Sequence, residues 1–551
     1  MSTPGQAGGV PVIVLKEGSN RSRGREAQHA NITAAKIVAE SVRSALGPKG
    51  MDKMLVSNFG DVTITSDGRT ILDEMDIQHP AAKMLVEVAK TQDNEVGDGT
   101  TSAVIIAGSL LNKAEELIDK NIHPTIIIDG YKKASLKALQ TLEKIAISVD
   151  LRNKEDLKKV SVTSMASKIV ADHKDFLAEI AVKAMLSVAE KDGKKYRANI
   201  DDVKVEKKTG ESLKETVLIN GILLDKEIVH SGMPKRVKNA KIALIDSALE
   251  VKKTEIDTKI NIETPEEINA FLAQEEAMIK EMVDKIVVSG AHVVICQKGI
   301  DDMTQHFLTK KGIVAIRRAK KSDMEKLARA TGGNIVTNLA SLSTKDLGYA
   351  ALVEERKIGE DKMTFIEGCK NPKSVTILIR GGTQQLTDEA DRSLHDALCV
   401  IKDVLEEPKI LAGGSAPELE MARVLKQYAE TLPGREQLAV RIYAEALESV
   451  TIALTENAGL DPIDILSELR SRHEKGEKWA GIEVLSGKVK DMSKMGVYEP
   501  IAVKKQIIKS STEAASLILK IDDIIAASKM KTPPMPPGGA PGGGYPGAGG
   551  H

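Results

Sequence analysis

Residues 94–102 read Asn-Glu-Val-Gly-Asp-Gly-Thr-Thr-Ser and run directly into the aliphatic stretch 103–111, which predicts a buried helix. Glycines let a backbone approach an anion closely, and a helix N-terminus offers free N–H groups and positive dipole charge. The stretch therefore predicts a phosphate-binding loop made of Gly99, Thr100, Thr101 and Ser102. An aspartate here would repel phosphate unless a divalent cation lay between them, so Asp98 indicates Mg2+. The alternative is an ordinary turn capped by Asp98 or Thr100.

Neither of the two commonest nucleotide-binding motifs is present. The chain contains no Gly-x-x-x-x-Gly-Lys-Ser/Thr loop, and the nearest match, from Gly481 to Lys488, has one residue too many and is followed by Val489. No Gly-x-Gly-x-x-Gly motif follows a predicted strand. A nucleotide site in this chain therefore needs a different fold.

Composition excludes several classes of protein. The 78 Lys and Arg residues nearly balance the 79 Asp and Glu residues, which argues against a protein that binds nucleic acid through charge. Aromatic residues make up only 2% of the chain, so base-stacking platforms are not expected. The three cysteines, Cys296, Cys369 and Cys399, are far apart and form no Cys-x-x-Cys motif, which indicates neither disulfides nor zinc.

Nothing in the sequence predicts a membrane protein or a secreted protein. No apolar run approaches the roughly 18 residues of a membrane span. The apolar run 10–15 is too short for a signal peptide. We therefore expect a cytoplasmic protein with no membrane span and no nucleic-acid partner.

The chain changes character along its length, and its 551 residues predict roughly three to four domains. The outer segments are mainly helical. Helical patterns are predicted at 31–46, from 80, from 102, at about 153–190 and from 388 to the end of the ordered chain, and a hairpin is predicted at 53–65. Between 218 and 368, short aliphatic strands alternate with helical patterns, which is typical of an α/β domain. This arrangement suggests that one outer domain is interrupted by an insertion.

One long helix is predicted inside the middle region. Residues 264–267 read Thr-Pro-Glu-Glu, a capping box with proline at the first helical position, and Gly290 ends the apolar pattern that follows. A surface helix with one buried stripe is the plain interpretation. The charged segment 252–259 predicts a solvated approach, so that the start of the helix would protrude. The tail 532–551 is rich in Gly and Pro and is expected to be disordered.

Further segments have the composition of ligand-binding loops, although each has an ordinary alternative. Residues 46–50 form a helix-ending turn, residues 65–68 form a turn, and residues 411–418 join two helices through paired glycines. Asp396 lies in a predicted helix, where its ordinary partner would be Arg392 four residues earlier. The order of these segments along the chain is more informative than any one of them.

Taken in order, these segments resemble the chaperonins over about residues 10–528. The resemblance rests on six motifs: Leu-Gly-Pro-Lys-Gly (46–50), Ser-Asp-Gly (66–68), Gly-Asp-Gly-Thr-Thr (97–101), His-Asp-Ala-Leu (395–398), Ala-Gly-Gly-Ser (412–415) and Gly-Val-Tyr-Glu-Pro (496–500). The segment 163–168 and the 264–290 helix are similar to the group II branch, which comprises the archaeal thermosomes and the eukaryotic cytosolic chaperonins. The segment 250–259 and the Gly/Pro tail favour the archaeal group.

The resemblance implies a multidomain chaperonin fold with a mainly α-helical equatorial domain, an α/β hinge domain and an α/β apical domain with a helical protrusion. The implied boundaries are 1–149 with 404–531 (equatorial), 150–217 with 369–403 (intermediate, or hinge), 218–368 (apical, with a lid protrusion at about 250–290) and 532–551 (tail). It further implies an ATP-dependent chaperone. Its subunits would form a homo- or hetero-oligomeric double ring with other chaperonin subunits and enclose unfolded or partly folded client proteins.

The resemblance also implies the ligands, ATP or ADP with Mg2+, and their contacts. The phosphates would lie on residues 99–102, the metal on Asp98, and the attacking water between Asp67 and Asp396. Further nucleotide contacts are implied for Leu46, Gly47, Pro48, Ser167, Lys168, Gly414, Glu499 (at the ribose) and Lys504. Such a set suffices, because the protein mainly positions groups and neutralises charge in phosphoryl transfer. Ser66 stands where the family often has Asn, which puts the fine positioning of Asp67 in doubt.

Three functions fit these residues. They are an ATP-hydrolysing foldase, a structural or holdase ring that binds nucleotide with little turnover, and a soluble phosphotransferase. The presence of both Asp67 and Asp396 favours the first. A phosphotransferase would need a dedicated small-molecule pocket and gives no reason for the Gly/Pro tail.

Overall fold

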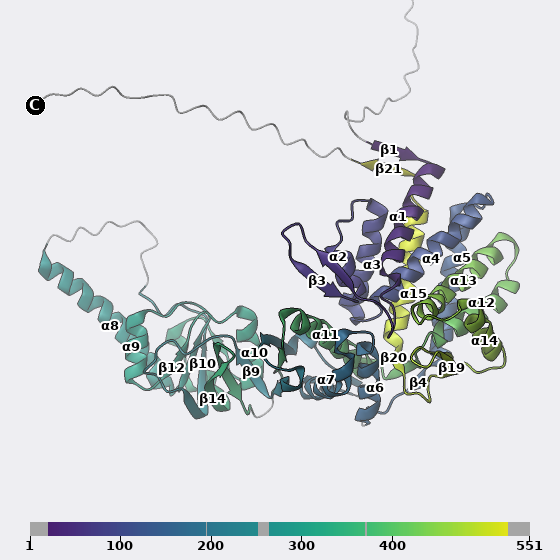
Figure 1. Cartoon of the computed structure of the whole chain (residues 1–551). Coiled ribbons are helices and arrows are strands. Elements are labelled where there is room, and N and C mark those ends of the chain that lie inside the picture. The colour runs from purple at the N-terminus through teal and green to yellow at the C-terminus, as the bar shows by residue number, and fades with distance from the viewer. Residues whose placement is uncertain (1–19, 152, 194, 252–263, 370–371, 527–551) are drawn as a thin grey trace, which may run out of the picture.

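A computed structural model describes residues 20–151, 153–193, 195–251, 264–369 and 372–526 (Figure 1). Its elements form a row of three parts: a helical body built from both ends of the chain, a middle part, and a distal part from which α8 (Pro265–Ser289) projects (Figure 1). The expectations for the apolar run 10–15, the charged approach 252–259 and the tail 532–551 lie outside the described residues.

The body contains helices from both ends of the chain. They are α1 (Arg25–Arg43), α2 (Gly68–Glu74), α3 (Pro80–Val96), α4 (Thr100–Asp119), α5 (Pro124–Ile145), α12 (Ala416–Glu430), α13 (Gly434–Asn457), α14 (Pro462–Glu474) and α15 (Ile501–Leu519). The central helix is α4, which packs against α1, α3, α13 and α15. Every residue from Thr100 to Gly108 is buried. A helix that is apolar on all sides must be surrounded by others, so the predicted buried helix is confirmed.

The body also contains short strands, some in local hairpins and some paired across long distances in the sequence. They are β1 (Asn20–Arg23) with β21 (Asp523–Ala526), β2 (Lys53–Val56) with β3 (Val62–Thr65), β18 (Ala480–Glu483) with β19 (Lys488–Asp491), and β17 (Lys409–Ala412) between β4 (Ile147–Ser148) and β20 (Tyr498–Pro500). The predicted hairpin is confirmed. The prediction of helices alone after residue 388 was wrong, because strands of three or four residues leave too short a pattern to detect.

The middle part consists of three helices and a three-stranded sheet. Its elements are α6 (Lys154–Met165), α7 (Lys174–Val188), α11 (Gln384–Glu406), β7 (Val203–Thr209), β8 (Val217–Ile219) and β16 (Val375–Gly381), with a hairpin of β5 (Glu190–Asp192) and β6 (Lys195–Arg197). Strand β16 pairs in parallel with β7 and antiparallel with β8. The helical stretch predicted over about 153–190 is interrupted after Met165 by a loop and a 3-10 turn, Ile169–His173. That loop carries Ser167 and Lys168.

The distal part is an α/β structure, as the sequence predicts. Its mixed sheet consists of β9 (Gly221–Leu224), β10 (Arg236–Ile245), β11 (Val293–Cys296), β12 (Val314–Ile316), β13 (Ile335–Val336), β14 (Gly348–Ile358) and β15 (Asp361–Glu367). Strands β10, β11 and β12 are parallel and are connected through α8 and α9 (Asp302–Lys310). A third helix, α10 (Lys321–Thr331), follows β12. All four residues of β11 are buried, as expected for a parallel strand covered on both faces.

Helix α8 has two different halves. It begins at Pro265 and ends before Gly290, whose φ of 79° stops the helix, so both predicted boundaries are confirmed. In its second half, Ile279, Val283 and Ile286 are buried against the distal core. In its first half, Phe271 and Leu272 are exposed and the helix projects away from the sheet (Figure 1). The second half of α8 is therefore a surface helix with one buried stripe, and the first half protrudes.

Two large hydrophobic cores hold the chain together. One contains buried side chains of both the body and the middle part, and the other belongs to the distal part. The junction between body and middle part is therefore a packed interface, and the candidate site lies in it. Among the described residues, no helix has the length and apolar character that crossing a membrane requires.

Candidate functional site

The predicted phosphate loop joins the end of α3 to the start of α4. Gly97 and Gly99 have φ values of 68° and 77°, in the left-handed region that favours glycine. A Cβ on Gly97 would overlap the side chain of Cys399, and a Cβ on Gly99 would lie 2.7 Å from Ile507 Cδ1. Both glycines are therefore required by the backbone conformation and by packing.

No side chain of the described residues caps the N-terminus of α4, because Gly99 occupies the cap position. Asp98 Oδ1 accepts a hydrogen bond from Gly99 N at 2.6 Å, and Thr100 Oγ1 donates to Asp67 Oδ1 at 3.3 Å. The alternative of a turn capped by Asp98 or Thr100 is therefore wrong. The uncapped N–H groups in the first turn of α4 are what an anionic phosphate would bind.

Asp67 is the N-cap of α2 and lies beside the start of α4. Its Oδ2 accepts hydrogen bonds from Thr70 N at 2.9 Å and from Thr70 Oγ1 at 2.7 Å. Burial alone would raise the pKa of Asp67, but the charge of Lys168 and the hydrogen bonds outweigh it, so the pKa is lowered. Asp67 is therefore an ionised carboxylate held from several sides.

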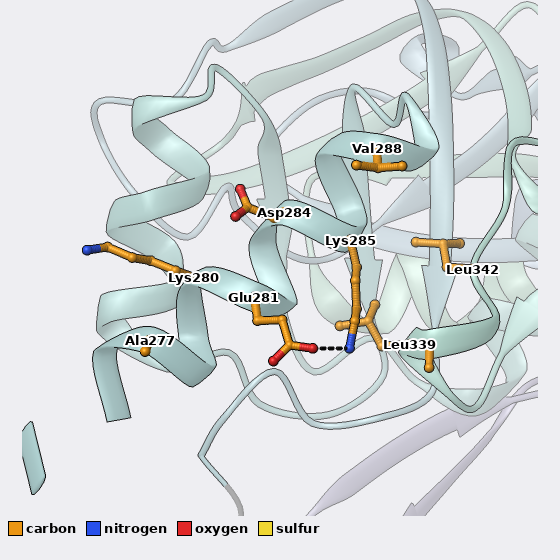
Figure 2. Close-up of a pocket in the computed structure, with 9 residues that line it drawn as sticks. Ala277, Lys280, Glu281, Asp284, Lys285, Val288, Leu339 and Leu342 are labelled. Carbon is orange, nitrogen blue, oxygen red and sulfur yellow. Dashed lines mark ion pairs between the residues drawn. The ribbon is translucent and has the colours of Figure 1, made fainter. Parts of the chain in front are cut away.

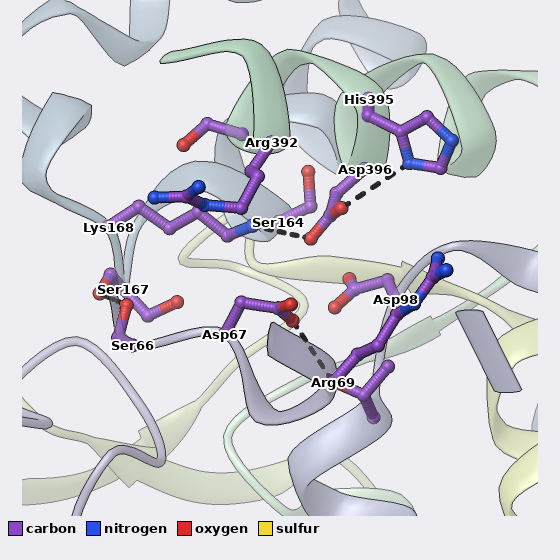
Figure 3. Close-up of polar contacts among 12 residues, drawn as sticks. Ser66, Asp67, Arg69, Asp98, Ser164, Ser167, Lys168, Arg392, His395 and Asp396 are labelled. Atoms are coloured by element: carbon purple, nitrogen blue, oxygen red, sulfur yellow. Dashed lines mark hydrogen bonds and ion pairs between the residues drawn. The ribbon is translucent and has the colours of Figure 1, made fainter. Parts of the chain in front are cut away.

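Lys168 and Asp396 form a buried ion pair, with 2.6 Å between Nζ and Oδ2 (Figure 3). The pKa of Lys168 is raised despite burial, because Asp396 and Asp67 both stabilise its charge. The expected pair of Asp396 with Arg392 was wrong. Arg392 instead lies 2.8 Å from Glu389, three residues earlier on α11, while Lys168 approaches Asp396 from the loop after α6.

Asp98 is a half-buried carboxylate that forms no ion pair with a Lys, Arg or His of the described residues. Burial, followed by the charges of Asp396 and Glu499, raises the pKa of Asp98 to about 7. A divalent cation would remove this unfavourable crowding of negative charge. Mg2+ usually takes one or two protein carboxylates and fills its other positions with water and phosphate oxygens, so Asp98 fits the role of its ligand.

A second group of possible metal ligands lies next to Asp98. Asp93, His395 and Asp396 hold their ligand atoms within 4.8 Å of one another, the one such group among the described residues. Arg69 already pairs with Asp93, and Lys168 with Asp396. Because both carboxylates have cationic partners, this group fits a metal less well than Asp98 does.

The predicted ribose contact Glu499 lies on strand β20, and its predicted neighbour Lys504 lies on α15. Glu499, opposite Leu411 in the sheet, lies 2.6 Å from Lys504 Nζ, which also lies 2.7 Å from Glu418 Oε1. All three charged side chains are largely buried, and burial raises the pKa of Glu499 although Lys504 opposes the shift. Lys504 is thus a fixed structural cation between two carboxylates, and it contacts Glu499 through Oε2.

The loop after β17 holds a strained residue. Gly414 and Ser415 have φ values of 63° and 64°, and Ser415 is one of the few residues other than glycine with a positive φ. Ser415 Oγ bonds to Thr451 Oγ1 on α13 at 2.7 Å. A Cβ on Gly414 would lie 2.8 Å from Ile482 O. This loop is therefore a tightly packed backbone turn, as expected for a segment that approaches a ligand with its main chain.

The turn at residues 46–48 is fixed against the end of α13. Asn457 Nδ2 donates to the carbonyl oxygen of Leu46 at 2.8 Å, and a Cβ on Gly47 would overlap Leu454. The structure connects this turn to the Ser415 loop through α13, since Thr451 and Leu454 lie one turn apart on that helix. The turn at residues 46–48 therefore lies on the same side of the candidate site as Gly414.

The structure brings most of the predicted residues together, from segments that are far apart in the sequence. Asp67, Asp98, Gly99, Thr100, Lys168 and Asp396 share hydrogen bonds or electrostatic interactions, and Thr101 and Ser102 follow in the first turn of α4. Ser167 contributes through its backbone, because its carbonyl oxygen accepts a hydrogen bond from Ser66 Oγ at 3.3 Å (Figure 3). The side chain of Ser66 is thus directed to the loop after α6.

Four residues of the site were missed from the sequence: Thr65, Asp93, Glu389 and Glu418. Glu389 is fully buried and lies seven residues before Asp396, so the two share one face of α11. Glu418 lies four residues after Gly414 of the glycine pair in the 411–418 loop. Helical spacing from Asp396 would have found Glu389, but Thr65 and Asp93 carry no sequence signal of their own.

Comparisons with known proteins agree with this architecture. The model of the TCP-1/cpn60 chaperonin family matches residues 38–529. The thermosome subunit beta of Thermococcus kodakarensis is 58% identical over 96% of this chain and 96% of the relative. The alpha and beta thermosome subunits of Archaeoglobus fulgidus are 56% and 57% identical over 96% and 95% of this chain and over 97% and 96% of each relative. The chain therefore belongs to the TCP-1/cpn60 chaperonin family, in its group II branch.

Proposed function

We propose that the junction between the helical body and the middle part binds ATP with Mg2+ and hydrolyses it. The observation that carries this proposal is the meeting of an uncapped helix N-terminus at Thr100 with the carboxylates of Asp67, Asp98 and Asp396. Backbone donors would take the phosphates, and a buried lysine balances the carboxylates. Fixed groups of this kind are the main requirement for phosphoryl transfer.

Each group has a distinct proposed role. Gly99, Thr100, Thr101 and Ser102 hold the phosphates, and Asp98 holds Mg2+, which when bound neutralises charge on the phosphate oxygens. Leu46, Gly47, Pro48, Gly414 and the backbone of Ser167 face the rest of the nucleotide. Glu499 accepts from the ribose, and Lys504 holds Glu499 in place.

Asp67 and Asp396 are the proposed catalytic residues. Hydrogen bonds from Thr70 and Thr100 fix both oxygens of Asp67. The ion pair with Lys168 orients Asp396 from the opposite side. A water placed between the two carboxylates would donate to both and direct its lone pair at the phosphate. The presence of this arrangement favours an ATPase over a holdase ring with little turnover.

The protein is a subunit of an ATP-dependent chaperonin that forms double rings. The exposed hairpin β2–β3 supports a ring contact, because Met54, Val56 and Phe59 are 66%, 64% and 94% exposed. The two-stranded sheets β2–β3 and β1–β21 also have unpaired edges that a neighbouring strand could join. Because Archaeoglobus fulgidus has both an alpha and a beta subunit, mixed rings are as admissible as homomeric ones.

We assign the domains as the resemblance implies, with the body as the equatorial domain, the middle part as the hinge and the distal part as the apical domain. The exposed first half of α8 would begin the lid. A hollow of about 570 Å³ lies between α8 and residues 339–342, and it holds the exposed Val288 beside Leu342 (Figure 2). We propose that unfolded client proteins contact this face. A cytoplasmic location completes the proposal.

Native mass spectrometry with an ATPase assay tests the proposed function. Purified protein incubated with Mg2+ and ATP should form a particle of megadalton size and release phosphate steadily. A monomer that hydrolyses ATP would support a phosphotransferase instead. A ring that binds ATP and releases no phosphate would support the holdase alternative.

A further inference from the structure

The buried carboxylate of Glu389 has no role in the site described so far. It lies on α11, is fully buried, and places one oxygen, Oε2, within 2.8 Å of Arg392 Nη2. Its other oxygen, Oε1, has no hydrogen-bond partner among the described residues. Burying a carboxylate so incompletely satisfied is costly. If the ion pair of Glu389 and Arg392 stabilised only helix α11, it could lie at the protein surface, where its desolvation would cost much less.

Glu389 and Arg392 reach from α11 to the segment that leads to Asp67. Thr65 Oγ1, which is also fully buried, donates to Glu389 Oε2 at 3.2 Å. Arg392 Nη2 donates to the carbonyl oxygen of Ile64 at 3.2 Å. Two side chains of one helix therefore hold two successive residues at the end of β3.

The hydroxyl of Thr65 links Glu389 to the backbone of Asp67. Thr65 Oγ1 accepts a hydrogen bond from the backbone N of Asp67 at 3.1 Å while it donates to Glu389. Because a hydroxyl has one proton, donation to Glu389 leaves its lone pairs to receive the amide. The Glu389 carboxylate can only accept, so Thr65 Oγ1 is the donor to Glu389 and the acceptor from Asp67 N.

The same helix carries Asp396 two turns after Glu389, about 10 Å along the axis. A single rigid element thus places Asp396 directly and Asp67 through Thr65. We propose that Glu389 is a positioning residue, which through Thr65 holds the carboxylate of Asp67 at a fixed position relative to that of Asp396. This inference rests on the proposed ATPase function.

Steady-state hydrolysis by assembled rings tests the inference. Thr65→Val, which keeps shape and removes the hydroxyl, should lower kcat on the order of tenfold to a hundredfold, the cost of misplacing a catalytic group by about 1 Å. The KM for ATP should stay within about twofold, because the phosphate loop is untouched. Thr65→Ser, which keeps the hydroxyl, should retain most of the parent kcat.

Two matched controls separate positioning from general damage to the fold. Thr304→Val removes an equally buried hydroxyl, which donates to Leu249 O in the distal part, and Glu448→Gln changes a buried, paired carboxylate of the body. Both should leave kcat unchanged. Glu389→Gln should lower kcat. Combining it with Thr65→Val should add little further loss of kcat, because both changes break the same chain of hydrogen bonds from Glu389 through Thr65 to Asp67. A parental kcat for Thr65→Val, an equal defect in Thr65→Ser, or a multiplicative double variant would overturn the inference.

Hydrogen exchange gives a readout that does not depend on turnover. The amide of Asp67 should exchange faster in Thr65→Val and in Glu389→Gln than in the parent, and at the parent rate in Thr304→Val. Unchanged exchange in Glu389→Gln would contradict the coupling. If the parent rings hydrolysed no ATP, the proposed function would fail, and the exchange rates would still decide whether Glu389 holds Asp67.

Discussion

Lys168 Nζ lies 2.6 Å from Asp396 Oδ2, and this buried ion pair joins the loop after α6 to the middle of α11. The two residues are 228 positions apart in the sequence. Asp67 also stabilises the charge of Lys168, so one cation serves carboxylates from both sides of the junction. The pair therefore fixes the Asp396 carboxylate within the middle part, and the charge of Lys168 links it to Asp67 of the body.

Removing only the cation should destabilise the protein. Lys168→Met leaves the buried Asp396 with His395, whose Nδ1 lies 3.8 Å from Oδ1, as its remaining ion-pair partner among the described residues, and breaking a buried pair in this way costs about 3–5 kcal/mol. Lys168→Met/Asp396→Leu should recover part of that loss, because it removes the charge of Asp396, while Asp67 keeps its hydrogen bonds from Thr70 and Thr100. Denaturant unfolding of the parent and the variants measures both effects. Lys183→Met, which breaks an exposed pair with Glu179, is the control and should change little. A double variant as unstable as the sum of both single variants would contradict the assignment.

Asp98→Ala should weaken the binding of nucleotide in the presence of Mg2+. The variant lacks the proposed metal ligand, whereas the backbone N–H groups of residues 99–102 remain. Isothermal titration with ADP in Mg2+ and in EDTA separates the two contributions. The parent should bind ADP more tightly with Mg2+ than without it, and the variant should lose that difference. Equal Mg2+ dependence in parent and variant would exclude Asp98 as the metal ligand.

Asp403 should make stability depend on pH. Its Oδ2 has no hydrogen-bond partner among the described residues, and burial raises the pKa of Asp403 to about 8, against the opposing charge of Lys402. The folded protein thus binds the proton more tightly than the unfolded chain does. This contribution is complete below the unfolded pKa of about 4 and is lost as pH rises towards about 8.

Asparagine does not ionise, so Asp403→Asn should not lose this stability as pH rises. The variant should therefore be more stable than the parent above about pH 8. Each unit of pKa shift is worth about 1.4 kcal/mol, so the difference should reach several kcal/mol. Thermal unfolding of both proteins between about pH 5 and pH 9 measures it. Asp284→Asn on the exposed face of α8 is the control. A constant difference between Asp403→Asn and the parent at all pH values would contradict the prediction.

Deleting residues 252–274 should abolish the enclosure of a client and spare ring assembly and ATP hydrolysis. The deletion removes the exposed half of α8 and keeps the buried stripe of Ile279, Val283 and Ile286. Protease protection of a bound client with ATP measures enclosure. A deletion extended to residue 285 removes two of the buried side chains and should instead unfold the distal part. Full protection by the shorter variant would place the lid elsewhere.

The conformation of the loop before α4 could be predicted from the sequence because its requirements are local. The positive φ of Gly97 and Gly99 and the buried start of α4 all follow from consecutive residues. The hairpin, the α/β alternation and both ends of α8 are local patterns as well. Such features depend on spacing and turn chemistry within a short window.

The partners of the charged residues could not be predicted in the same way. Asp396 pairs with Lys168 and not with Arg392, since the choice depends on how the loop after α6 packs against α11. The hydrogen bond between Thr65 and Glu389 joins segments 324 residues apart. Interactions of this kind arise from tertiary packing, and a single sequence does not show them.

Asp396→Ala in assembled rings tests the central claim most directly. Mg·ATP binding and single-turnover hydrolysis should be measured on the same preparation, with Asp391→Ala on the same helix as the control. The account predicts that the variant assembles and binds ATP with about the parent affinity, while hydrolysis falls by a factor of roughly 10² to 10⁴. Hydrolysis at the parent rate would contradict the account and reduce Asp396 to the structural partner of Lys168.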